Sequence, residues 1–196
     1  MIHTVEVQIR HWREDDAAAM HAAVTASLEH LRPWMPWIAQ EPKTVDERRA
    51  LIREWETQRR AGGDESFAIC VDGAVVGSCG LHRRIGAGGV EIGYWVHPAH
   101  TNRGVATEAA RLLCERAFAD PSVERVEIHH ATTNVHSGRV PAKLGFTHVE
   151  DRERAPEAPG EDGRFRVWRL TRGDWDPARP ARRGGAGRAG SRFAPT

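Results

Sequence analysis

The sequence has few cysteines, no excess charge and no long apolar run, and each absence narrows what the chain can be. Its three cysteines, Cys70, Cys79 and Cys114, form no C-x-x-C pair, and an odd number cannot close a disulfide framework. No stretch approaches the length of a membrane span, and the first ten residues lack the apolar core of a secretion signal. A net charge of +1 gives no field that would favour nucleic acid or a membrane. We therefore expect a cytoplasmic protein.

The composition fits one compact domain followed by a tail. The chain has 196 residues, of which 40% are hydrophobic and 28% charged, enough for a full core. From about Asp176 it changes to Pro, Ala, Gly and Arg, a composition that cannot offset the entropy lost on ordering. We expect a domain over residues 1–175 and a disordered tail over 176–196. The five arginines of the tail leave contact with RNA open, although a solvated tail is the simpler interpretation.

Hydrophobic periodicity predicts alternating strands and helices. A period of two over Val5 to Arg10 indicates a first strand. Asp15 and Asp16 are placed to cap one helix that reaches Leu31 and is stopped by Pro33.

Further along, the sequence predicts a second helix and a hairpin. Thr44 to Glu47 form a capping box at the start of that helix. A two-residue turn at Asp72-Gly73 predicts a hairpin that would place Cys79 opposite Ser66. After the hairpin the sequence predicts a strand over Val90–His97, a long helix over Gly104–Ala119 and a strand over Val123–Ala131. A short helix over Ser137–Leu144, a strand from Phe146 and a last strand over Phe165–Leu170 follow.

A strand that runs through a glycine turn into a helix is the first candidate site. The segment Thr101-Asn102-Arg103-Gly104-Val105-Ala106-Thr107 follows the strand and opens the long helix. A helix start leaves backbone N–H groups unpaired, and together with the helix dipole these groups suit a phosphate. Gly104 permits close approach of the ligand, and Ala106 is too small to block it. An ordinary strand-to-helix connection remains the alternative, because the segment is neither a dinucleotide fingerprint nor a P-loop.

Two blocks of sequence resemble a known family. The segment EIGYWVHPAHTNRGVATEA resembles the acyl-CoA-binding segment of the GNAT superfamily of N-acetyltransferases, whose usual pattern is Gln/Arg-x-x-Gly-x-Gly/Ala. Gly104 and Ala106 match that pattern, whereas Thr101 replaces Gln or Arg and Asn102 replaces a frequent glycine. A second block, Asn134 to Phe146, resembles the family's N-x-x-S-x-x-V-x-x-K-x-G-F stretch. The Pro- and Trp-containing segment before these blocks resembles the RimJ and RimL group, and the whole resemblance spans about residues 5–175.

The resemblance implies a fold, a donor and a set of binding residues. The fold would be α+β, with a mixed, mostly antiparallel sheet of about seven strands and helices on both faces. The chain would bind acetyl-CoA and move its acetyl group to an amine. The residues implied in binding the cofactor are Val96, Asn102, Arg103, Gly104, Val105, Ala106, Thr107, Asn134, Ser137 and Lys143.

Two residues are candidates for catalysis. Glu91 is a carboxylate inside an apolar strand, which suits a general base; a structural ion pair with an arginine is the alternative. Ser137 matches the serine that protonates the departing CoA thiolate in resembling enzymes, while its simpler role is to cap the short helix. Pro141 lacks an N–H, so the carbonyl of Ser137 is expected to lose its helical donor and stay free.

The acceptor is the least determined part. Trp34, Trp37 and Trp95 are candidates to line an amine pocket, although the first two would also serve as core. The acceptor would be a protein N-terminal α-amine, a lysine or a small-molecule amine. A succinyl-CoA donor and a catalytically silent acyl-CoA sensor remain alternatives, a homodimer is left open, and we expect no metal because no histidine pair lies in a known ligand frame.

Overall fold

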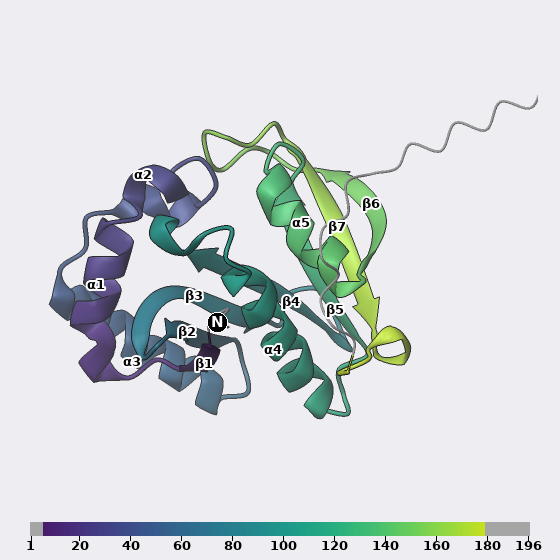
Figure 1. Cartoon of the computed structure of the whole chain (residues 1–196), viewed down its shortest axis with the longest axis horizontal. Helices are drawn as coiled ribbons and strands as arrows, with labels where there is room; N and C mark the ends of the chain where they lie inside the picture. Colours follow the sequence, from purple (N-terminus) through teal and green to yellow (C-terminus); the bar gives the residue numbers. More distant parts are fainter. Residues whose placement is uncertain (1–5, 179–196) are drawn as a thin grey trace, which may run out of the picture.

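The computed structural model describes residues 6–178 and has a seven-stranded sheet with helices on both faces (Figure 1). The strands are β1 (Val7–His11), β2 (Glu65–Val71), β3 (Ala74–His82), β4 (Gly89–Val96), β5 (Arg125–Ala131), β6 (Thr147–Glu153) and β7 (Arg164–Thr171). The α-helices are α1 (Ala17–Thr25), α2 (Leu28–Leu31), α3 (Val45–Arg60), α4 (Val105–Ala119) and α5 (Val135–Leu144). Short 3-10 turns are η1 (Glu14–Asp16), η2 (Pro36–Gln40), η3 (Pro98–His100) and η4 (Arg172–Asp174).

The strand order confirms the predicted architecture. The strands lie in the order β1-β2-β3-β4-β5-β7-β6, and neighbouring strands in this sheet are antiparallel except for β4 and β5. A parallel pair needs a crossover connection, which α4 provides between β4 and β5. The fold is thus a mixed, mostly antiparallel α+β sheet, as expected.

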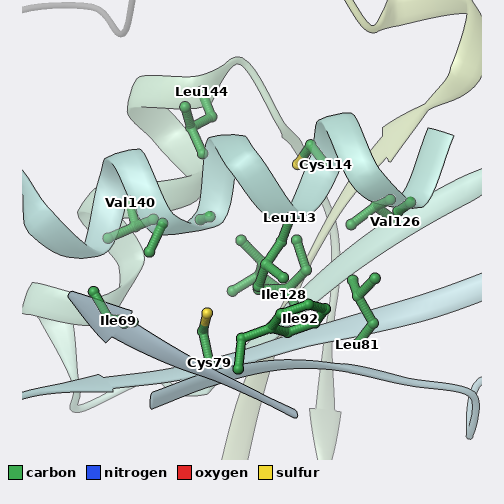
Figure 2. Close-up of a cluster of buried hydrophobic side chains, with 14 of the residues drawn as sticks. Ile69, Cys79, Leu81, Ile92, Leu113, Cys114, Val126, Ile128, Val140 and Leu144 are labelled. Carbon is green, nitrogen blue, oxygen red and sulfur yellow. The ribbon is translucent and has the colours of Figure 1, made fainter. Parts of the chain in front are cut away.

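Two apolar cores cover the two faces of the sheet. The larger core lies under α4 and α5, where Leu113 and Val140 pack against Ile92 and Ile128 of the central strands (Figure 2). The smaller core lies against α1 and α3 and includes Met20. Successive residues of a strand point to opposite faces, which is why β2 contributes alternate side chains to the two cores. Both faces of β4 are therefore backed by packed side chains, which hold the strand in place.

The helices on the second face differ in one respect from the prediction. The expected single helix to Leu31 is divided into α1 and α2, with Ser27 between them. The buried Ser27 hydroxyl donates to the carbonyl of Ala23 at 2.6 Å, a contact that competes with regular helix geometry. By contrast, the capping box at Thr44 is confirmed, because its side chain accepts from the Glu47 amide at the start of α3.

The predicted hairpin forms, but its register is shifted. Cys79 pairs with Phe67 and not with Ser66, so that prediction was wrong. The reason is a β-bulge between Ile69 and Cys70, which adds a residue to one strand. The three cysteines are buried and free.

Two predictions, the start of the first strand at Val5 and the disordered tail, include residues that the structure does not describe. Val5 and residues 179–196 lie outside the described residues, so the division into residues 1–175 and a tail stays a prediction. Within residues 6–178, no helix is long and apolar enough to cross a membrane.

Candidate functional site

The two central parallel strands part along their length. β4 and β5 pair only from Gly89 opposite Arg125 to Glu91 opposite Glu127. Beyond this point β4 continues along β3 as far as Val96, while β5 continues along β7. The last residues of β4 therefore have one backbone edge that no strand covers, and its N–H and C=O groups are available to an extended ligand.

The uncovered edge of β4 leads into the turn before α4. Two residues of this turn have positive φ, Asn102 at 58° and Gly104 at 81°. Asparagine tolerates this conformation better than most residues, which accounts for its presence where the family often has glycine. Gly104 is the N-cap of α4 and has no side chain to offer the first amides. A Cβ at Gly104 would have no heavy atom within 4 Å, so the space in front of the turn is open.

The turn is anchored on both sides, by hydrogen bonds at His97 before it and by buried residues of α4 after it. The His97 amide donates to the carbonyl of Val76 at 2.7 Å, and the His97 ring accepts from the Ala99 amide at 3.1 Å. Val105 and Thr107 are buried in the first turn of α4, whereas Asn102 and Arg103 are exposed. Each predicted pyrophosphate-binding residue thus lies at one fixed helix start.

The beginning of α5 reaches the same strand. The Asn134 side chain accepts from the Ser137 amide at 3.2 Å, so Asn134 is the N-cap and the predicted capping role of Ser137 was wrong. The Tyr94 hydroxyl lies 3.1 Å from both the carbonyl oxygen and the Oγ of Ser137. The carbonyl of Ser137 is therefore not free, contrary to the prediction. Lys143 lies six residues after Ser137, about 9 Å further along the helix, apart from this group.

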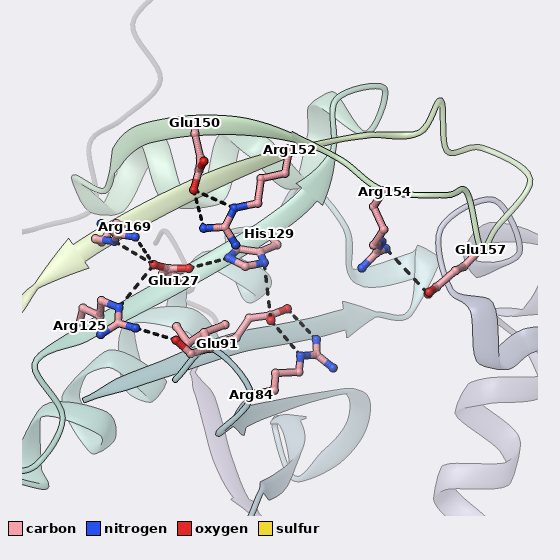
Figure 3. A network of polar contacts seen from close by, with 11 residues as sticks. Arg84, Glu91, Arg125, Glu127, His129, Glu150, Arg152, Arg154, Glu157 and Arg169 are labelled. Atoms are coloured by element: carbon pink, nitrogen blue, oxygen red, sulfur yellow. Dashed lines mark hydrogen bonds and ion pairs between the residues drawn. The ribbon is translucent and has the colours of Figure 1, made fainter. Parts of the chain in front are cut away.

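Glu91 lies on the other face of β4, in a network in which the buried carboxylates of Glu91 and Glu127 pair with more exposed arginines (Figure 3). Arg84 donates to both of its carboxylate oxygens, at 2.9 and 2.6 Å, and His129 Nδ1 lies 3.6 Å away. Burial would raise the pKa of Glu91, but the hydrogen bonds from Arg84 and the charge of His129 outweigh burial and keep that pKa below its usual range. Glu91 is thus an ionised carboxylate at neutral pH.

His129 connects Glu91 to a second buried carboxylate. Its Nε2 lies 2.7 Å from Glu127, which also accepts from Arg169 at 2.8 Å. Sequence reasoning missed this network, although Arg125, Glu127 and His129 alternate along β5 and so share one face. Within residues 6–178, no group of three or more histidine, cysteine, aspartate or glutamate side chains is placed to hold a metal.

The predicted acceptor-side tryptophans come from separate elements. The rings of Trp37 and Trp95 lie 6.3 Å apart and pack against the smaller core. Trp34 lies instead beside the β6–β7 loop, whose Gly160 amide donates to the Pro33 carbonyl at 2.8 Å. In Figure 1 this loop crosses from β7 to the segment after α2. Sequence reasoning could not foresee that contact, because the two segments are more than a hundred residues apart.

Comparison with known proteins shows that the chain is similar to acetyltransferases. Residues 6–147 match the family model described as "Acetyltransferase (GNAT) domain". The Bacillus subtilis (strain 168) protein named "Putative ribosomal N-acetyltransferase YdaF" is 28% identical over 142 residues, which are 71% of this chain and 77% of that protein. Among solved structures, Mycobacterium smegmatis RimJ in complex with CoA-disulfide is 26% identical with a TM-score of 0.79, over 89% of this chain and 85% of that chain. A RimL structure at 17% identity, with a TM-score of 0.76 over 84% of this chain and 93% of that one, shows a likeness of fold alone.

Proposed function

Because the chain belongs to the GNAT acetyltransferase family, we propose that it transfers the acetyl group of acetyl-CoA to a primary amine by direct attack in a ternary complex. The observation that carries this proposal is the uncovered edge of β4, which leads directly into the open turn at Gly104. An extended pantetheine arm fits such an edge, and a pyrophosphate fits the helix start at its end. The name of YdaF, which refers to the ribosome, further supports a protein acceptor.

The proposed cofactor-binding residues would contact different parts of acetyl-CoA. Backbone amides from Asn102 to Thr107 would hold the pyrophosphate, since α4 offers unpaired donors there. Arg103 is exposed beside that turn and would add a positive charge. Val96 would bind the pantetheine arm through its backbone, and Asn134 would meet the same arm from the start of α5. For Lys143, a role in binding the cofactor rests on the family resemblance alone.

On the acceptor side, Glu91 would remove the proton of the substrate ammonium. Glu91 lies three residues before Tyr94, about 10 Å along the strand, so it would act as a base through water. Its lowered pKa makes it a weak base. A lysine amine with a pKa near 10.4 costs about 4 to 5 kcal/mol to deprotonate at pH 7, but an α-amine near 8 costs only about 1 to 1.5 kcal/mol. We therefore propose a protein N-terminal α-amine as the acceptor, bound beside Trp34, Trp37 and Trp95.

The role of Glu91 can be separated from its ion pair. Glu91→Gln keeps the shape and is expected to lower kcat about 100-fold, because the general base is lost. The matched control is Glu127→Gln, which removes a second buried carboxylate from the same network. We expect a much smaller loss of kcat there, measured by thiol release at saturating substrates. Equal losses in both variants would show that Glu91 has the structural role of the alternative interpretation.

Ser137 gives a second test on the donor side. Ser137→Ala is expected to lower kcat about 100-fold and to leave the dissociation constant of acetyl-CoA within a factor of two, because the hydroxyl is proposed to act only as the thiolate leaves. Calorimetric titration measures the affinity and thiol release measures kcat. Unchanged turnover would remove Ser137 from the mechanism.

The proposed function as a whole is tested by calorimetric titration with acetyl-CoA, succinyl-CoA and free CoA, followed by thiol release on a panel of peptides, lysine derivatives and small amines. Binding of acetyl-CoA with release on peptides that have a free α-amine would support the proposal. Preference for succinyl-CoA would correct the donor. Tight binding without turnover on any amine would favour an acyl-CoA sensor, and no binding would refute the site.

A further inference from the structure

Tyr94 is the chain's only tyrosine, and its hydroxyl contacts the proposed proton donor. It lies on β4, on the face that packs under α4 and α5. Burial raises the pKa of its phenol well above the usual value, with the hydrogen bond to Ser137 opposing that effect, so the hydroxyl keeps its proton. The proposed reaction does not use this hydroxyl as an acid or a base.

The need for the Tyr94 hydroxyl follows from the sequence of α5. A helical carbonyl normally accepts from the N–H four residues later, and for Ser137 that residue is Pro141, which has no N–H. The carbonyl would be left without a helical donor at the point where α5 faces β4. The Tyr94 hydroxyl occupies that place at 3.1 Å.

The two contacts of Tyr94 fix the direction of the Ser137 side chain. A carbonyl oxygen only accepts, so the Tyr94 proton serves the carbonyl of Ser137. The phenol oxygen still has acceptor capacity and lies 3.1 Å from Ser137 Oγ. The Asn134 side chain holds the Ser137 amide at the same time. Backbone and side chain of Ser137 are thus held from β4 and from the N-cap together.

We propose that Tyr94 is a positioning residue, which replaces the donor missing at Pro141 and holds the Ser137 oxygen in place. The single proton of the Ser137 hydroxyl rests on the phenol oxygen and turns to the thiolate as that group leaves. This inference rests on the proposed role of Ser137. It assigns Tyr94 no proton transfer of its own. It also explains why the chain tolerates a proline inside α5 close to the proposed active site.

Kinetics of three variants test the inference. Tyr94→Phe removes only the hydroxyl and is expected to lower kcat about tenfold while the affinity for acetyl-CoA stays within a factor of two, because Ser137 is present but less well aimed. Tyr94→Phe with Ser137→Ala should lose no more than Ser137→Ala alone, since both changes affect one group. Tyr94→Phe with Pro141→Ala should recover part of kcat, because the backbone of an alanine supplies the helical N–H that proline lacks.

A readout that is independent of activity completes the test. Protein labelled with ¹³C in the tyrosine ring gives a single tyrosine signal, which should shift in Ser137→Ala and in Pro141→Ala as the hydrogen bonds of the hydroxyl change. Thermal unfolding checks that each variant is folded. Wild-type kcat in Tyr94→Phe, or losses that multiply with Ser137→Ala, would overturn the inference. Absence of turnover in the wild-type protein would instead refute the proposed function, so the two failures are distinguishable.

Discussion

Replacing Gly104 by glutamate is expected to weaken acetyl-CoA binding by a factor of about 100 or more, which corresponds to about 2.7 kcal/mol. Gly104 has a φ of 81° and open space in front of it, and we place the pyrophosphate in that space. A glutamate would fill the space and bring a negative charge to the phosphates, and such juxtapositions of like charges cost several kcal/mol. Calorimetric titration with acetyl-CoA measures the loss directly.

The matched control for Gly104→Glu is Gly62→Glu. Gly62 follows α3, has a φ of 76° and, like Gly104, has nothing within 4 Å of its ideal Cβ position. Both variants therefore carry the same added charge and a similar backbone strain of about 1 kcal/mol. We expect Gly62→Glu to bind acetyl-CoA as the wild type does. If Gly104→Glu also binds normally, the cofactor does not use this turn.

The sequence predicted correctly those features that depend on interactions between residues close together in the chain. The capping box at Thr44 and the turn at Asp72-Gly73 rest on hydrogen bonds and φ values within a few residues, and the structure has both. The mixed, mostly antiparallel sheet of about seven strands was predicted from family resemblance, because periodicity alone does not say which strands are neighbours.

The remaining features depend on contacts that only the fold creates. The bulge beside Cys70 shifts the hairpin register, and no local residue announces it. Proline at 141 correctly indicated a carbonyl without its helical donor, but the donor that replaces it, Tyr94, lies 43 residues from Ser137 in the chain. The ion pair of Glu91 with Arg84 was left as an alternative, and its presence makes Glu91 a weaker base than an isolated buried carboxylate would be.

The two faces of β4 thus have different tasks in the proposed mechanism. Tyr94 points toward α5 and holds the residue that would serve the departing thiol. Glu91 lies on the opposite face, paired with Arg84 and close to His129, and would act there as the base for the amine. Because residues on the two faces of one strand would serve donor and acceptor, a small displacement of β4 would disturb both sides of the proposed reaction at once.

Gly77→Ala is expected to produce such a displacement and to destabilise the fold strongly. Gly77 lies on β3 opposite Val96, and an added Cβ would lie 2.3 Å from the carbonyl oxygen of Trp95. Backbone must then move, which costs about 3 kcal/mol and lowers the melting temperature by roughly 10 °C for a chain of this length. Acetyl-CoA binding should weaken as well at temperatures where circular dichroism shows the variant folded, because the uncovered edge at Val96 shifts.

Gly93→Ala separates this effect from the general cost of a methyl group in the central strands. An added Cβ at Gly93 would meet only the side chain of His82, at 3.2 Å, and a side chain can give way where a backbone carbonyl cannot. Its melting temperature should therefore fall by much less than that of Gly77→Ala. If the two variants melt alike, the close approach of β3 and β4 at Gly77 does not fix the position of Val96, and the link between β3 and the cofactor edge is refuted.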